Sequence, residues 1–165
     1  MNTSIKSLAL IGLLIPTLAT AQERYGSRTG HVAFFSETSV ENIEANNHKA
    51  ASVYDATSGA LEFSVLIKAF EFEKALMQEH FNENYMESNT YPKAVFKGKV
   101  VGITAADLKK PGKHDVTVEG DLTMHGVTKK ITEKATISVE PTGAVKAETK
   151  FVVKPLAEAL GIRHY

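Results

Sequence analysis

The sequence contains no cysteine. This absence excludes disulfide bonds, thiolate metal ligands, a cysteine nucleophile and a lipid-modified N-terminal cysteine. Stability must therefore come from an apolar core. An excess of charge of one sign is also missing, because 19 Lys and Arg balance 19 Asp and Glu and neither sign forms a block. Since a basic patch is the footprint of a nucleic-acid binder, we expect no nucleic-acid partner.

Long apolar runs are scarce, and the one that stands out lies at the N-terminus. Residues 8–18 are apolar apart from Gly12, Pro16 and Thr17, they follow Lys6, and small residues at 19–21 come next. This pattern is typical of a secretory signal peptide cleaved after Ala21. A run of about 11 residues is too short to span a bilayer, which takes about 20. The sequence therefore predicts a signal peptide at 1–21 and one domain at 22–165, periplasmic or secreted and not membrane-spanning.

Strand periodicity dominates the rest of the chain. Apolar and polar residues alternate without exception over 114–124. A register slip of one residue would therefore expose every apolar side chain of this strand to water. Further strands are expected at 31–35, 50–54, 60–70, 94–101, 127–139 and 145–153, joined by turns at 55–59, 109–112, 125–126 and 141–143. Residues 22–30 read as a mobile N-terminus, and 41–47 as an irregular strand or turn. The predicted fold class is all-β: an antiparallel sheet of about eight strands curled into a barrel.

One stretch, residues 70–92, interrupts the strands with a helical pattern. Its apolar arc is made by Leu76, Met77, Phe81 and Tyr85, which predicts one amphipathic helix of about three turns covering the barrel. Polar residues and a proline after position 87 end the helix.

The same stretch is dense in groups that could carry chemistry. His80, Glu83 and Glu87 lie at i, i+3 and i+7, where imidazole and carboxylate ligands could share a face and suit zinc, manganese or iron. A metal-dependent hydrolase is therefore one alternative. However, the sequence contains no HExxH motif, no GxSxG elbow and no glycine-rich phosphate loop. We therefore predict no catalytic residue, no metal and no cofactor, with these side chains bonding to strand ends instead.

The phenylalanines leave two interpretations of the interior open. All eight fall in predicted strands or in the helix. They could fill a solid core, as in a stress-related interaction module, or line a pocket for an apolar ligand.

Several sequence blocks resemble the YceI family, in the form found as exported proteins of Bacteroidetes-type bacteria. The blocks are GHVAFFSET at 30–38, VENIEAN at 40–46, LMQEHFNENYMES at 76–88, YPKAVFKG at 91–98 and GDLTMHGVTK at 120–129. The resemblance runs from about residue 30 to residue 153. It implies a lipocalin-like antiparallel barrel with a helical excursion, which binds a polyisoprenoid or similar long-chain lipid in an apolar tunnel, without catalysis and in some members as a homodimer.

Strand and helix periodicity then suggests which residues would line such a tunnel. The predicted ligand-binding residues are Phe63, Val65, Ile67, Phe81, Tyr85, Phe96, Val116, Val118, Leu122 and Phe151. The sequence departs from the family pattern after residue 153, where further strands would complete the barrel. We expect the tail at 154–165 to be truncated or frame-shifted, leaving the barrel incomplete at its C-terminus with an unpaired strand edge.

Overall fold

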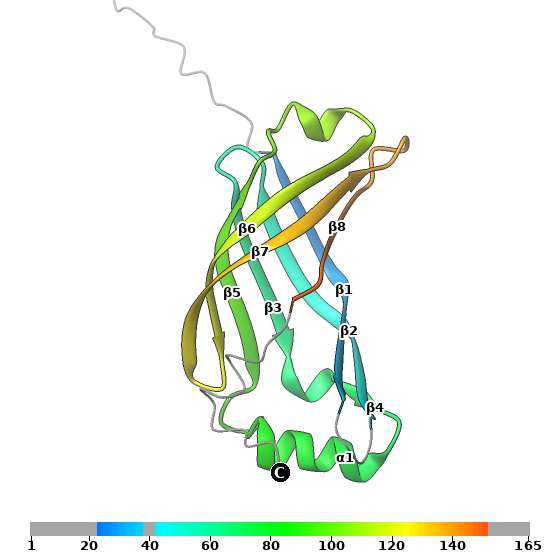
Figure 1. The fold of residues 1–165 in the computed structure, drawn as a ribbon, viewed down its shortest axis with the longest axis vertical. Helices are drawn as coiled ribbons and strands as arrows, with labels where there is room; N and C mark the ends of the chain where they lie inside the picture. Colours follow the sequence, from blue (N-terminus) through cyan, green and yellow to red (C-terminus); the bar gives the residue numbers. More distant parts are fainter. Residues whose placement is uncertain (1–22, 38–41, 152–165) are drawn as a thin grey trace, which may run out of the picture.

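The computed structural model describes residues 23–37 and 42–151. They form an antiparallel sheet that curls into a nearly closed barrel, with one short helix at one end (Figure 1). The expected fold class, an all-β lipocalin-like barrel with a helical excursion, is confirmed. The strands are β1 (Arg24–Glu37), β2 (Asn42–Asp55), β3 (Ala60–Leu66), β4 (Glu71–Phe72), β5 (Lys93–Val101), β6 (Gly112–Met124), β7 (Val127–Val139) and β8 (Val145–Thr149).

Neighbouring strands follow chain order almost throughout. The sheet runs β1-β2-β3-β5-β6-β7-β8, and every pairing is antiparallel. The short β4 pairs with β2 on the edge opposite β1. Among the described residues, β1 and β8 form the two ends of this order. The predicted tail at 154–165 lies outside the described residues.

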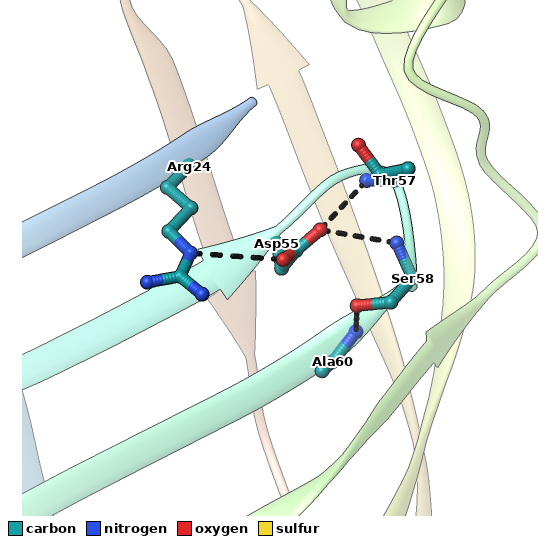
Figure 2. Close-up of polar contacts among 5 residues, drawn as sticks. All are labelled: Arg24, Asp55, Thr57, Ser58 and Ala60. Carbon is teal, nitrogen blue, oxygen red and sulfur yellow. Dashed lines mark hydrogen bonds and ion pairs between the residues drawn. The ribbon is translucent and has the colours of Figure 1, made fainter. Parts of the chain in front are cut away.

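Two of the predicted turns are fixed by local chemistry. His125 and Gly126 have φ of 51° and 73°, and they join Met124 to Val127 in a two-residue hairpin whose positive φ angles match the twist of the strands. At the β2–β3 turn, Oδ1 of Asp55 accepts hydrogen bonds from the backbone N–H groups of Thr57 (3.0 Å) and Ser58 (3.1 Å), as Figure 2 shows. Arg24 reaches the same carboxylate from β1, with its Nε 3.7 Å from Oδ2. These two predicted turns are therefore confirmed.

The beginning of the chain differs from the expectation. The strand expected at 31–35 begins already at Arg24, so the residues expected to be mobile belong to β1. Of the two alternatives for 41–47, the irregular strand is correct, because residues 42–55 form one long strand. The ladder between β1 and β2 shifts register between Ser27 and Gly30 and again between Gly30 and Val32. Such bulges break the alternation by which a strand is recognised in sequence.

A buried asparagine holds the bulge in β2. The side-chain amide of Asn47, which is fully buried, donates to the carbonyl of Leu66 (2.9 Å) and accepts from the N–H of Lys49 (2.9 Å). It thereby links β2 to the end of β3. There the predicted strand 60–70 gives way to a 3-10 turn, η1 (Ile67–Ala69).

The helical stretch is shorter and more irregular than predicted. An α-helix of six residues, α1 (Ala75–His80), continues into a π-helical turn, η2 (Phe81–Tyr85). A π-turn changes the angular spacing of side chains, so the expected apolar arc does not hold. Leu76 is 63% exposed and Tyr85 48% exposed, whereas Met86 is 4% exposed.

The apolar core is divided into two clusters. The far-end cluster lies at the end of the barrel away from α1, beside a short 3-10 turn, η3 (Asp107–Lys109), and contains Tyr54, Ala56, Val100, Leu108, Val116, Ile137 and Val139. The helix-end cluster contains Ala45, Ala50, Val65 and Phe70, with Val32, Phe34, Phe63, Phe72 and Phe81 packed against it. The region between these clusters is the candidate site.

Candidate functional site

Three sets of directly paired residues span the wall between the clusters, and we call each set a rung. Alternate residues of a strand share one face. The rungs include Phe63, which packs on the helix-end cluster, and Val118, which packs on the far-end cluster. The rungs therefore face the interior of the barrel. From the helix end, the first rung is Phe63, Phe96, Leu122 and Lys129; the second is Leu61, Gly98, Gly120 and Ile131; the third is Val100, Val118 and Glu133.

A pair of glycines lets an aromatic ring lie flat on this wall. Gly98 and Gly120 face each other across β5 and β6, and a Cβ added to either would lie 2.6 or 2.9 Å from Cζ of Phe96. The ring therefore covers both glycines, where side chains would otherwise stand. Phe96 itself is 5% exposed.

Most residues of the rungs are only half-buried although they face inward. Phe96 and Val100 are buried, but the other apolar members, among them Phe63, Leu122 and Ile131, keep part of their surface accessible. On the same strand β7, Ile137 in the far-end cluster is only 4% exposed. A packed core leaves few such surfaces, so the half-buried rungs keep apolar surface that a further partner could cover.

The predicted lining residues divide among several environments. Phe63, Phe96, Val118 and Leu122 belong to the rungs, Val116 to the far-end cluster, and Val65 to the helix-end cluster. Ile67 lies in η1 and is 1% exposed. Tyr85 and Phe151 are exposed, by 48% and 40%. Phe81 packs in an aromatic group, with ring centroids 4.9 Å from Phe72, 5.6 Å from Phe70 and 6.4 Å from Phe34.

Two charged residues of the wall were not among the lining residues predicted from the sequence. Lys129 and Glu133 occupy the inner face of β7 together with Ile131, and both are half-buried. Their position follows from the alternation of β7, in which residues 127, 129, 131, 133 and 135 share one face. Strict application of that alternation would have found them.

The far end of the barrel contains buried polar atoms without a partner among the described residues. The hydroxyl of Tyr54 and Nε2 of His114 are two such atoms. Burial raises the pKa of Tyr54, and the neighbouring Tyr25 and Asp55 add to the effect. At neutral pH this tyrosine is therefore an uncharged hydroxyl in an apolar cluster.

The helical stretch is joined to the β6–β7 hairpin through a histidine. Nε2 of His125 lies 2.7 Å from Oε2 of Glu87, and the ring of Tyr91 lies 4.6 Å from the imidazole, centroid to centroid. A Cβ on Gly126 would lie 2.8 Å from the Tyr91 ring. We call this contact the Glu87–His125 latch. It brings together two residues that are 38 positions apart in the sequence.

The latch also bears on the metal-ligand hypothesis. Glu87, the third member of the candidate set with His80 and Glu83, contacts His125 instead. In the part of the chain that the structure describes, no three His, Asp or Glu side chains come together in an arrangement that could hold a metal ion. Within the same residues, no helix is both long and apolar enough to cross a membrane.

A small hollow between β2, β3 and β5 is smaller than a typical ligand site. It has a volume of about 110 Å³ and is lined by Ala51, Ser52, Val53, Glu62, Phe63, Ser64 and Val95. Small-molecule sites typically measure about 300–1,000 Å³.

Comparison with protein families identifies the chain. A family model described as the YceI-like domain matches residues 17–156. The chain belongs to the YceI-like family. Comparison with curated protein sequences gives no match. The resemblance seen in the sequence is therefore confirmed at the level of the family, and the exported Bacteroidetes-type branch stays a prediction.

One solved structure aligns with this YceI-like chain closely enough to support the fold, and two others align more weakly. A polyisoprenoid-binding domain from Saccharophagus degradans aligns with a TM-score of 0.59 at 14% identity, over 72% of this chain and 68% of that one. The YceI protein of Campylobacter jejuni aligns at 18% identity over 87% and 77% of the two chains, with a TM-score of 0.42. BcnA of Burkholderia cenocepacia aligns at 14% identity over 70% and 60%, with a TM-score of 0.41.

Proposed function

We propose that this YceI-like protein is an exported carrier that holds a polyisoprenoid or similar long-chain lipid inside the barrel and catalyses no reaction. The observation that carries the proposal is the row of inward-facing, half-buried apolar side chains between the two clusters. Phe63, Leu122 and Ile131 belong to this row. An apolar ligand beside them would remove that surface from water.

Burial of apolar surface supplies the binding energy in this proposal. Each 100 Å² of apolar surface removed from water contributes about 2.5 kcal/mol. Affinity would therefore grow with the length of the lipid tail. The same half-buried side chains argue against a solid-core interaction module, because a filled core would leave them fully buried.

The family and its relatives support this assignment. The similar Saccharophagus degradans structure is described as a polyisoprenoid-binding domain. Export is supported by the signal-peptide pattern at residues 1–21. The metal-dependent hydrolase has less support, because Glu87 is engaged with His125.

Native mass spectrometry of the exported protein, followed by organic extraction, tests the proposal. We expect a co-purifying lipid that adds a constant mass to the folded protein, and an N-terminus that starts at Gln22. The same spectrum reports whether the protein forms the predicted homodimer. A folded protein that carries no lipid and takes up none from liposomes would refute the carrier function.

A further inference from the structure

The hydroxyl of Tyr54 is buried and has no hydrogen-bond partner among the described residues. The whole residue is only 8% exposed, so its ring lies in the apolar interior. A buried polar group without a partner costs free energy, and native structures contain few of them. Phenylalanine would fill nearly the same space without this cost. Packing alone therefore does not account for a tyrosine at this position.

Tyr54 lies where the candidate site meets the far-end cluster. It stands directly opposite Leu61, so the second rung continues across β2 to Tyr54. Leu61 and Val118, half-buried members of the second and third rungs, pack against the cluster that contains Tyr54. A molecule lying along the rungs would therefore have one end beside this tyrosine.

The other orphaned atom of the far end is less suited to such a molecule. Nε2 of His114 is also buried without a partner among the described residues. However, His114 stands opposite Ile137, a member of the far-end cluster, and Val116 of the same cluster separates it from the rungs along β6. Tyr54 is therefore the orphaned group next to the half-buried surface.

The charges around this end favour an uncharged partner for the hydroxyl. Glu133 stands opposite Val118 in the third rung, where it faces the interior and is half-buried. Its carboxylate would repel an anion, and repulsion between like charges is stronger where water is partly excluded. Tyr54 keeps its proton at neutral pH, because burial raises its pKa, and it can therefore donate a hydrogen bond.

We propose that the Tyr54 hydroxyl donates a hydrogen bond to the uncharged polar head of the carried lipid, so that the preferred ligand is a long-chain alcohol, ketone or amide rather than the corresponding acid. This inference rests on the proposed carrier function and adds the class of head group and the end of the barrel at which the head lies. The apolar tail then extends along the rungs toward the helix-end cluster. Ligand binding removes the cost of the orphaned hydroxyl, which the ligand-free protein bears as a loss of stability.

The test compares three molecules that share one branched isoprenoid chain, namely phytane, phytanol and phytanic acid. Delipidated protein is titrated with each at about pH 8, where the acid is ionised, by displacement of a fluorescent apolar probe. We expect Tyr54→Phe to weaken the binding of phytanol about fivefold or more and to leave that of phytane unchanged. The same variant should be more stable than the wild type without ligand. A purely structural role would move stability and affinity in the same direction.

Tyr91→Phe is the matched control, because it removes a hydroxyl from a tyrosine outside the rungs, whose ring contacts His125. It should leave all three affinities as in the wild type. Glu133→Gln should tighten the binding of phytanic acid and leave that of phytane unchanged.

Three results would overturn the proposal. The first is a wild-type protein that binds the acid as tightly as the alcohol, and this comparison needs no variant to fold. The second is an unchanged affinity for phytanol in the Tyr54→Phe variant, and the third is an equal loss of affinity for phytanol and phytane in that variant. If the wild-type protein binds none of the three molecules, the proposed carrier function itself fails.

Discussion

The replacement Gly98→Ala tests the close approach of β5 and β6 at the second rung. A Cβ at this position would lie 2.2 Å from the carbonyl oxygen of Glu119 and 2.8 Å from Cα of Gly120, besides 2.6 Å from the Phe96 ring. The ring could turn away, but the two backbone atoms could move only by separating the strands. Overpacking of this kind costs about 1–3 kcal/mol. Removing a glycine from the unfolded chain returns about 0.4–1 kcal/mol, so we expect a net loss of about 1–2 kcal/mol.

Urea unfolding followed by circular dichroism measures this loss. With a slope of about 1–3 kcal/mol per molar urea, the midpoint should fall by roughly 1 M. Gly26→Ala is a suitable control, because its added Cβ would meet a single backbone oxygen, that of Ser52, at 3.2 Å. A Gly98→Ala variant that is as stable as the wild type, or more stable by the entropy of the lost glycine, would refute the close approach at this rung.

Three other changes test the far end, the latch and the helix. Tyr54→Phe removes a buried hydroxyl that has no hydrogen-bond partner among the described residues, and should raise the free energy of unfolding by about 1 kcal/mol. Because burial raises the folded-state pKa of Tyr54, the wild type should also lose stability as the pH rises above about 10, and the variant should lose less. A decrease in stability for Tyr54→Phe would mean that the hydroxyl is hydrogen-bonded. His125→Asn keeps a residue that tolerates positive φ but breaks the latch, and a double-mutant cycle with Glu87→Gln should give a coupling of at most about 1 kcal/mol, since Glu87 is 53% exposed; zero coupling would show that the contact contributes nothing. Phe81→Ala should lower the free energy of unfolding by about 2–4 kcal/mol, whereas Leu76→Ala, at a 63% exposed position, should change it by less than about 0.5 kcal/mol; similar losses for both would contradict the packing of the helical stretch.

The strands that the sequence predicted well are those whose alternation is regular. The strand predicted at 114–124 matches β6, and that at 127–139 matches β7 to the residue. The turn at His125–Gly126 was predicted as well, because a residue pair that accepts positive φ stood between two alternating runs. Local chemistry was sufficient in these places.

The remaining differences depend on partners that a local pattern does not contain. β1 and β2 pair through bulges, and Asn47 is buried because the carbonyl of Leu66 accepts its hydrogen bond. The change from α-helix to π-turn at Phe81 displaced Tyr85 from the expected apolar arc. Such features are determined by tertiary contacts, which override the propensity of a segment.

Part of the candidate site was predictable from the alternation of the strands. Phe63, Phe96 and Leu122 were expected to face inward, and the ladder places them in one rung. The charge at Lys129 was passed over, although it shares the parity of its apolar neighbours, because polar residues were assigned to the outer face.

The Glu87–His125 latch has a consequence for sequence variation. Glu87 and His125 are the two residues other than glycine with positive φ in the described part of the chain, and they contact each other. Each position therefore admits few side chains for backbone reasons and fewer still that suit its partner. Over generations, a change at one position should persist mainly where the other has changed to match, so the two should covary among related proteins although neither lies in the barrel wall.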